Sequence, residues 1–173
     1  PGARPQLIDM SLNLEEIKRA RDEADCLADA ATVEAALDRM AAEITARLAD
    51  ANPLVYAVMN GGLIFAGRIL PRLPFPLEVA YLHASRYGHA IQGTLLDWRV
   101  RPTQDLRGRT VLVLDDILDE GHTLAAIIDY LKAEGAREVV SAVLVHKVHE
   151  RKAYPGMRAD FTGLDVADRF LFG

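Results

Sequence analysis

The hydrophobic positions of this chain form short apolar runs separated by stretches with helical spacing. Apolar runs occupy residues 54–59, 77–82, 110–114 and 139–145. Runs of this length are typical of strands covered on both faces of a parallel sheet. The order strand, helix, strand, helix, strand predicts an α/β fold with a central, mostly parallel sheet flanked by helices.

Three helices are expected between these strands. The first lies within residues 14–50, where one apolar face recurs every three or four positions and Asp29 or Thr32 can cap its start. A short second helix is expected at 63–70, and a third carries its core face between Leu124 and Leu131, with Gly135 at its end. The face of the first helix consists of Val33, Leu37, Met40, Ile44 and Leu48.

Residues 83–103 show mixed polarity and no clear period. The segment is long for a simple connection, so we expect a mobile functional loop there. Ligands of open α/β sheets bind outside the carboxyl ends of the strands, which draws attention to residues 60–62 and 115–123.

Composition restricts the class of protein. The chain has 173 residues, 50% hydrophobic and 26% charged, which fits one globular domain. Its 20 basic and 25 acidic side chains give a net charge of −5, which argues against nucleic-acid binding. Cys26 is the single cysteine, and no apolar run approaches the ~20 residues that cross a bilayer. We therefore expect a soluble cytoplasmic protein that does not bind membranes.

The most informative segment follows the 110–114 strand. Asp115 and Asp116 are adjacent carboxylates suited to ribose hydroxyls or hydrated Mg²⁺, and Asp119 follows in a short loop. Gly121 lets the backbone approach a ligand, and Thr123 offers a hydroxyl where a helix begins, at a point that attracts phosphate. A simpler alternative is a capped helix, with Asp119 as the cap and a solvated strand end before it.

The complete pattern, an apolar strand, D-D-x-x-D-x-G-x-T and an amphipathic helix, resembles the phosphoribosyl-diphosphate signature of type I phosphoribosyltransferases. Residues 58–62 resemble the diphosphate loop of that family, and residues 160–173 resemble its purine-binding end segment. Together these matches resemble the purine branch, the hypoxanthine-guanine phosphoribosyltransferases. Further matched positions are Arg86 and Tyr87 of the flexible loop and Lys147, which in the family reads the purine 6-oxo group.

The resemblance implies one domain over residues 1–173, with a core at about 32–147 and a small hood from about 1–30 and 148–173. It implies transfer of phosphoribosyl from phosphoribosyl diphosphate to hypoxanthine or guanine, giving IMP or GMP, with Mg²⁺ as cofactor and a homodimer or homotetramer as assembly. The ligands would be phosphoribosyl diphosphate, a purine base and a purine nucleotide.

The resemblance also implies a role for each matched residue. Asp119 would act at purine N7, and the peptide between Met59 and Asn60 would be cis. The diphosphate loop would consist of Met59, Asn60, Gly61 and Gly62. The phosphoribosyl group would be held by Asp115, Asp116, Glu120, Gly121, His122 and Thr123, with Asp115 and Asp116 also facing the metal through ribose or water. The purine would meet Lys147, Phe170 and Leu171.

Three residues depart from the family pattern. Asn60 stands in place of a lysine, Glu120 in place of a threonine and Arg86 in place of a serine. Glu120 is compatible with a phosphate site only if its carboxylate turns away while the backbone N–H is used. Two alternatives stay open: a xanthine-preferring phosphoribosyltransferase, and a non-catalytic regulator of the same fold that senses phosphoribosyl diphosphate.

Overall fold

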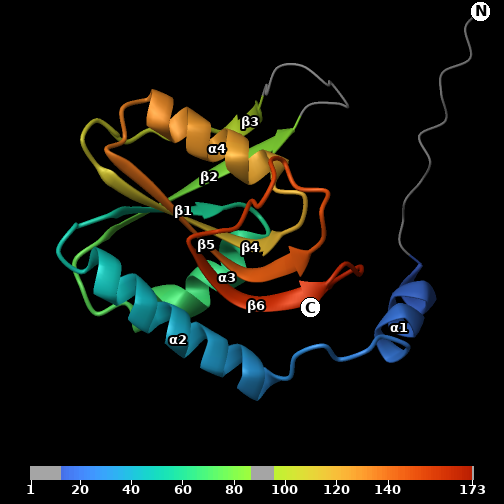
Figure 1. Cartoon of the computed structure of the whole chain (residues 1–173). Coiled ribbons are helices and arrows are strands. Elements are labelled where there is room, and N and C mark those ends of the chain that lie inside the picture. The colour runs from blue at the N-terminus through green and yellow to red at the C-terminus, as the bar shows by residue number, and fades with distance from the viewer. Residues whose placement is uncertain (1–12, 87–95, 173) are drawn as a thin grey trace, which may run out of the picture.

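The computed structural model describes residues 13–86 and 96–172, and the centre of this described part is one six-stranded sheet (Figure 1). The strand order is β3-β2-β1-β4-β5-β6, and every neighbouring pair is parallel except the antiparallel pair β2 and β3. The predicted mostly parallel sheet is therefore confirmed. The strands are β1 (Leu54–Val58), β2 (Glu78–Arg86), β3 (Leu96–Val100), β4 (Thr110–Leu118), β5 (Glu138–Val148) and β6 (Phe161–Ala167).

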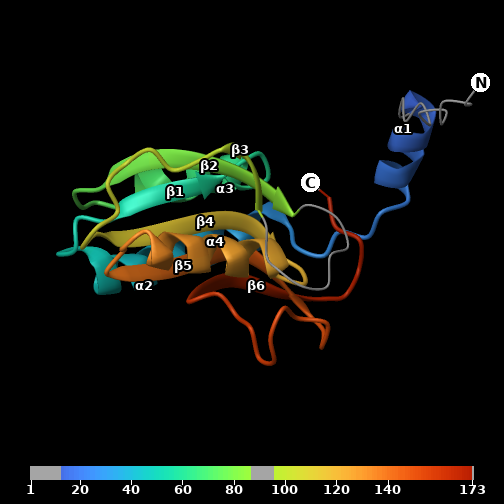
Figure 2. The same ribbon diagram turned by 90° about the horizontal axis from the view of Figure 1, so that it is seen from above.

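Helices cover both faces of the sheet (Figures 1 and 2). On one face lie α2 (Ala30–Leu48) and α3 (Gly62–Ile69), which continues into the 3₁₀ turn η1 (Leu70–Arg72). On the other face lies α4 (His122–Ala133). The remaining helix, α1 (Leu14–Asp22), stands apart from the sheet and has no buried residue. No helix in the described part of the chain is both long and apolar enough to cross a membrane.

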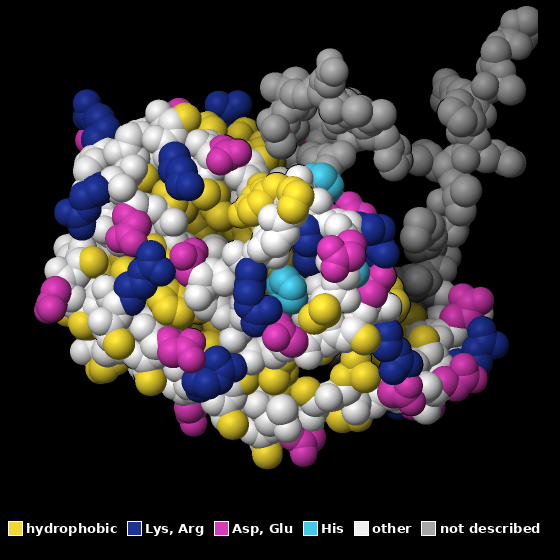
Figure 3. Space-filling view, in the orientation of Figure 1, with side chains coloured by type: hydrophobic (Ala, Val, Ile, Leu, Met, Phe, Trp, Pro, Cys, Tyr) yellow, Lys and Arg dark blue, Asp and Glu magenta, His cyan; other side chains and the backbone are white. Residues whose placement is uncertain are grey.

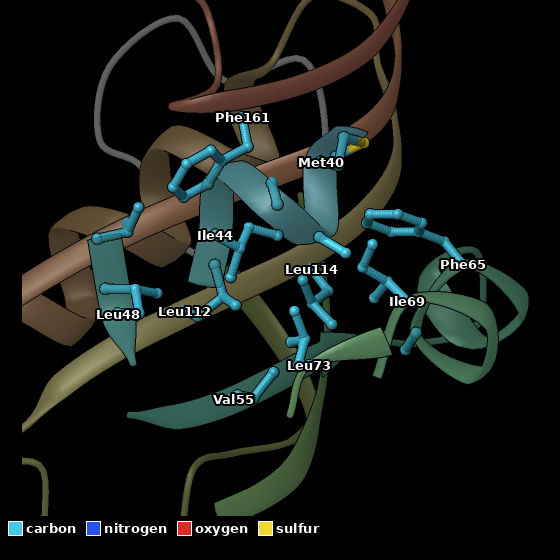
Figure 4. Close-up of a cluster of buried hydrophobic side chains, with 14 of the residues drawn as sticks. Met40, Ile44, Leu48, Val55, Phe65, Ile69, Leu73, Leu112, Leu114 and Phe161 are labelled. Atoms are coloured by element: carbon cyan, nitrogen blue, oxygen red, sulfur yellow. The ribbon is translucent and has the colours of Figure 1, made fainter. Parts of the chain in front are cut away.

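The side chains of β1 show how the sheet builds two cores. Neighbouring side chains on a strand point to opposite faces, so Val55 and Ala57 pack under α2 and α3, whereas Tyr56 packs under α4. Figure 4 shows the first of these clusters, in which Met40, Ile44 and Leu48 of α2 meet the sheet. The predicted apolar face of this helix is confirmed.

The start of α2 is set by a side-chain cap. Asp29 is the N-cap residue, and its carboxylate accepts a hydrogen bond from the Thr32 N–H at 2.8 Å. This bond satisfies one of the N–H groups that a helix leaves free in its first turn. Of the two candidate caps, the structure selects Asp29.

The prediction of a mobile functional loop over 83–103 is wrong at both ends of this range, where strands are found. β2 continues to Arg86, and residues 96–100 form β3, which pairs antiparallel with it. Trp98 of β3 packs against Tyr130 of α4, with ring centroids 4.8 Å apart, so the added strand extends the second core. The alternation of the apolar Leu96, Trp98 and Val100 with polar residues was the sequence signal for this strand. Residues 87–95, including Tyr87, lie outside the described part.

Other strands are longer than the apolar runs predicted. β4 continues through Asp115 and Asp116 to Leu118, because its backbone stays paired with β5 after the apolar residues end. β6 was not predicted, and its buried Phe161 and Gly163 lie against β5 and α2. Because polar side chains occupy the strand ends, the apolar runs in the sequence underestimate the lengths of these strands.

Segments near the two ends of the described part of the chain meet outside the sheet. Arg169, after β6, donates to the carboxylate of Asp25, before α2, at 2.5 Å. Both side chains are more than half exposed, so this surface ion pair adds little stability. It does bring together the segments that we expected to form a hood, and that division of the chain stays a prediction.

Candidate active site

A cleft of about 800 Å³ opens where β1 and β4 end and α4 begins. Figure 3 shows acidic, basic and histidine side chains crowded together on the face that carries the ends of the parallel strands. This is the edge at which the sequence predicted a ligand site. The residues that line the cleft are Val58, Gly61, Ala84, Asp115, Asp116, Ile117, Leu118, Asp119, Glu120, Gly121, His122, Thr123, Leu124 and Arg151.

Two carboxylates of β4 form one wall of this cleft. The Asp115 carboxylate accepts the Asp116 N–H at 3.1 Å, and the Asp116 carboxylate accepts the Ile117 N–H at 2.8 Å. Gly61 lies directly against Asp116, because a Cβ at Gly61 would come within 2.7 Å of an Asp116 carboxylate oxygen. Any larger residue at this position would therefore force the Asp116 carboxylate to move.

The pKa of Asp115 lies far above the ordinary aspartate range. Burial, reinforced by the negative charge of Asp116, raises the pKa of Asp115 to about 7. Near neutral pH the free protein therefore contains both the protonated and the ionised form of Asp115. Its carboxyl group can donate or accept a hydrogen bond, which suits contact with a hydroxyl group.

The loop between β4 and α4 ends in a glycine with a left-handed backbone. Gly121 has φ of 83° and is the N-cap of α4, which has no side-chain cap. This corrects the simpler alternative in which Asp119 caps the helix. The positive φ favours glycine here, and a Cβ would also come within 2.5 Å of Met157 Sδ, so that side chain would have to shift. The first-turn N–H groups of α4 therefore face the cleft without a capping side chain.

Glu120 and His122 flank this glycine at the surface. Glu120 is exposed, and its carboxylate lies 3.6 Å from His122 Nε2. The Glu120 carbonyl accepts the Ala153 N–H at 2.8 Å. Glu120 also lines the cleft and its side chain is about half exposed, so the expectation that its carboxylate turns away from a phosphate stays a prediction.

Asp119 is held from two sides by side chains of β5 and the turn after it. Lys147 Nζ donates to Asp119 Oδ2 at 2.7 Å, and His149 Nε2 lies 2.8 Å from Asp119 Oδ1. The Lys147 bond, followed by the His149 bond, holds the pKa of Asp119 below its usual range. Lys147 does not line the cleft directly, but Asp119 connects it to the cleft wall.

Sequence reasoning missed several residues of this cluster. His149 follows Lys147 by two positions, the spacing that puts both side chains on one side of a strand, and this is the signal that could have found it. Lys152 Nζ donates to the carbonyl oxygens of Asp119 and Lys147, the latter at 2.7 Å, and ties the two segments together. Arg151 lines the cleft and pairs with Asp168 at 2.8 Å.

Other predicted site residues lie apart from the cleft walls. Phe170 is 88% exposed and lies beside Phe172, with ring centroids 6.2 Å apart and ring planes tilted by 39°. Neither Phe170 nor the half-buried Leu171 lines the cleft. Arg86 is the last residue of β2.

The peptide between Met59 and Asn60 is cis, as the resemblance implied. Gly62 follows in the first turn of α3, where a Cβ would come within 2.8 Å of the Leu114 carbonyl oxygen.

Two groups of oxygen and nitrogen ligands could face a cation. In Asp119, His149 and Asp168, one ligand atom from each lies within 4.8 Å of the others. The Lys147 ammonium already neutralises Asp119, which disfavours a cation there. Asp115 and Asp116 offer carboxylate oxygens at the cleft wall beside the open Gly61 loop, and this donor set fits a hard cation such as Mg²⁺.

Comparisons with known proteins agree with this architecture. Residues 23–156 match the family model of the phosphoribosyl transferase domain. The hypoxanthine-guanine phosphoribosyltransferase of Bacillus subtilis is 30% identical over 138 residues, which cover 78% of this chain and 74% of that protein.

Solved structures give the same result. A hypoxanthine-guanine-xanthine phosphoribosyltransferase superposes with a TM-score of 0.72 at 26% identity, over 84% of this chain and 82% of the other. A hypoxanthine phosphoribosyltransferase from Staphylococcus aureus has a TM-score of 0.80 at 19% identity, over 91% and 85% of the two chains, and shares the fold. The chain therefore belongs to the phosphoribosyltransferase family, in the group that contains the hypoxanthine-guanine enzymes.

Proposed function

We propose that the protein is a purine-salvage phosphoribosyltransferase. It transfers the 5-phosphoribosyl group of phosphoribosyl diphosphate to hypoxanthine or guanine, and releases diphosphate with IMP or GMP. The observation that carries this proposal is the single cleft wall from Asp115 to Thr123, where two carboxylates, a third carboxylate and an uncapped helix start follow one another. Each of these groups suits a different part of the product nucleotide: its ribose, its base or its 5′-phosphate.

The phosphoribosyl group would lie along this wall. The 5′-phosphate would sit at the start of α4, held by backbone N–H groups of Glu120, Gly121 and His122 and by the Thr123 hydroxyl. Asp115 and Asp116 would meet the ribose hydroxyls. The half-protonated state of Asp115 supports this role, because it can serve a hydroxyl as donor or acceptor.

The leaving diphosphate would face the loop of Met59, Asn60, Gly61 and Gly62. Its neighbour Asp116 would hold Mg²⁺ together with Asp115, through ribose or water. When bound, Mg²⁺ neutralises charge on the departing diphosphate. Because Asn60 carries no charge, backbone groups of the loop and the nearby metal would have to replace the lysine of the family pattern.

The base would approach the cluster of Asp119 and Lys147. Lys147 would donate to the purine 6-oxo group, and Asp119 would accept or share the proton at N7. The present bond between them supports this pairing, since a base that offers an acceptor and a donor can replace both partners at once. Phe170 would stack on the base and Leu171 would lie beside it, which requires the segment after β6 to close. Arg86 and Tyr87 would belong to a loop that excludes water.

The reaction would pass through an oxocarbenium-like ribosyl group. Residues that orient the base and the sugar would therefore contribute more to the rate than a covalent intermediate with the protein. We place the enzyme in the cytoplasm as a homodimer or homotetramer that binds neither nucleic acid nor membrane.

A base panel tests the proposal. The purified protein, phosphoribosyl diphosphate and Mg²⁺ are incubated separately with hypoxanthine, guanine, xanthine and adenine, and nucleotide formation is followed by chromatography. Hypoxanthine and guanine should react, and adenine should react at least about 100-fold more slowly because its amino group meets the Lys147 ammonium. Faster turnover of xanthine would indicate a xanthine-preferring enzyme. Ligand binding without turnover of any base would indicate a sensor of phosphoribosyl diphosphate.

A further inference from the structure

His149 occupies one of the two carboxylate oxygens of Asp119. Lys147 Nζ binds Oδ2 and His149 Nε2 binds Oδ1, so both oxygens have partners in the free protein. The proposed function assigns Lys147 to the purine 6-oxo group. When Lys147 turns to the base, His149 is left as the side chain that holds Asp119.

The hydrogen bonds around His149 fix where its proton resides. The Arg151 N–H donates to His149 Nδ1 at 3.1 Å, so Nδ1 is an acceptor and carries no proton. Nε2 is then the protonated nitrogen of a neutral ring, and it donates to Asp119 Oδ1. The His149 side chain is only 6% exposed, so the imidazole itself is shielded from water, whereas the Asp119 side chain is 47% exposed.

A neutral donor suits a carboxylate that has to accept a proton. A second cation at Oδ1 would favour the ionised carboxylate further and weaken it as a base. A neutral imidazole orients the carboxylate at a smaller electrostatic cost. Lys152 also helps to hold Asp119 beside Lys147, because its ammonium donates to the backbone carbonyl oxygens of both residues.

We propose that His149 is the positioning residue for Asp119: its Nε2–H holds Oδ1 so that Oδ2, released by Lys147, faces N7 of the bound purine. This role rests on the proposed function. It assigns to His149 no contact with the substrate, and it makes the orientation of Asp119 independent of the lysine that reads the base.

Two matched variants test the role. In His149→Gln the side-chain amide can place an N–H near the position of Nε2 and keep the bond to Asp119. In His149→Asn the shorter amide can still accept the Arg151 N–H but does not reach Asp119. We expect kcat to fall about ten- to a hundredfold in His149→Asn, because misplacement of a reacting group by about 1 Å has effects of this size.

The same experiment separates positioning from folding. In His149→Asn the KM for phosphoribosyl diphosphate should stay within about threefold of the wild type, because the phosphoribosyl wall is untouched. His149→Gln should recover most of kcat, and both variants should unfold at similar temperatures. Equal kcat in His149→Asn and the wild type, or a His149→Gln variant as slow as His149→Asn, would overturn the proposal.

Heteronuclear NMR of the imidazole nitrogens tests the contact without relying on turnover. The free wild-type protein should show His149 as the Nε2–H tautomer at pH 7, and a charged ring or an Nδ1–H tautomer would overturn the proposal. If the wild type turns over no base in the panel, the proposed function fails and the role in catalysis fails with it. The tautomer then still reports whether the contact to Asp119 exists.

Discussion

At the scale of single residues, the cleft depends on carboxylates whose properties come from their neighbours. Asp115 and Asp119 are four positions apart, yet burial raises the pKa of the first and Lys147 lowers the pKa of the second. The same residue type therefore serves two tasks. This contrast is typical of sites in which one group binds hydroxyls and another exchanges a proton.

Replacement of Asp119 tests its part in the reaction. Asp119→Asn keeps the size and the contact to His149 but removes the proton acceptor, so kcat should fall about 10²–10⁴-fold while affinity for IMP changes little. Steady-state kinetics and calorimetry measure the two quantities. Lys147 loses its counter-charge in this variant, so thermal unfolding serves as the control for a folding defect. A near-normal kcat in a well-folded variant would exclude Asp119 as the proton acceptor.

Asp115 predicts a pH dependence of stability. Its pKa is raised in the folded chain, so its contribution to the free energy of unfolding is fully present below about pH 4 and is lost as the pH rises through about 7. Asp115→Asn keeps a neutral side chain at every pH. At pH 8 this variant should therefore be more stable than the wild type by about 1–4 kcal/mol, with no difference near pH 4.

Urea unfolding of the ligand-free protein at several pH values measures this difference. Asp97→Asn is a matched control, since Asp97 is an exposed aspartate of β3 away from the cleft. Equal stability of Asp115→Asn and the wild type at pH 8 would show that Asp115 titrates normally.

At the scale of elements, α4 is the part of the fold that faces an anion. Its first turn has no side-chain cap, and the left-handed Gly121 turns the chain so that free N–H groups meet the cleft. The loop before this turn carries the carboxylates of Asp119 and Glu120, and Arg151, which also lines the cleft, is paired with Asp168. The helix start, and not a basic side chain of the loop, is therefore the main attraction for phosphate.

Two substitutions in this turn test that conclusion. Thr123→Ala should weaken binding of a 5′-nucleotide by about 1–3 kcal/mol, the cost of a lost hydrogen bond to a charged group. Glu120→Thr should bind equally well or slightly better, because it removes a negative charge beside the phosphate. Calorimetric titration with IMP and GMP measures both. Loss of activity in Glu120→Thr would instead assign the carboxylate a direct role.

At the scale of the whole molecule, the sequence predicted the interior of the fold better than its edges. The central strands and α2 bury continuous or periodic apolar residues, so their positions were evident. β3 and β6 lie at the two edges of the sheet and alternate apolar with polar side chains, a weaker signal. The ends of β4 and β5 carry the polar groups of the cleft. These polar residues interrupt the apolar pattern by which a strand is recognised in the sequence.

The candidate site, like the fold, was predicted only in part. The segment from Asp115 to Thr123 was found because its residues are contiguous, and the structure places all of them in one cleft wall. The bond between Asp119 and Lys147 joins residues 28 positions apart, and His149 and Lys152 reach Asp119 from 30 and 33 positions away. Such contacts depend on which strands become neighbours, and one sequence does not specify that order.

The alternation of side chains along β5 constrains which genetic changes this protein tolerates. Lys147 reaches Asp119 because β5 keeps one register along its pairing with β4 and β6, which fixes the position of this side chain. Loss of one residue within 139–146 would shift the following side chains by half a repeat, so that the exposed Val148 takes the place of Lys147. A single-codon deletion in this strand should therefore remove the contact between Lys147 and Asp119. Across related genomes, length variation should therefore collect in the turn at 101–108 and stay out of β5.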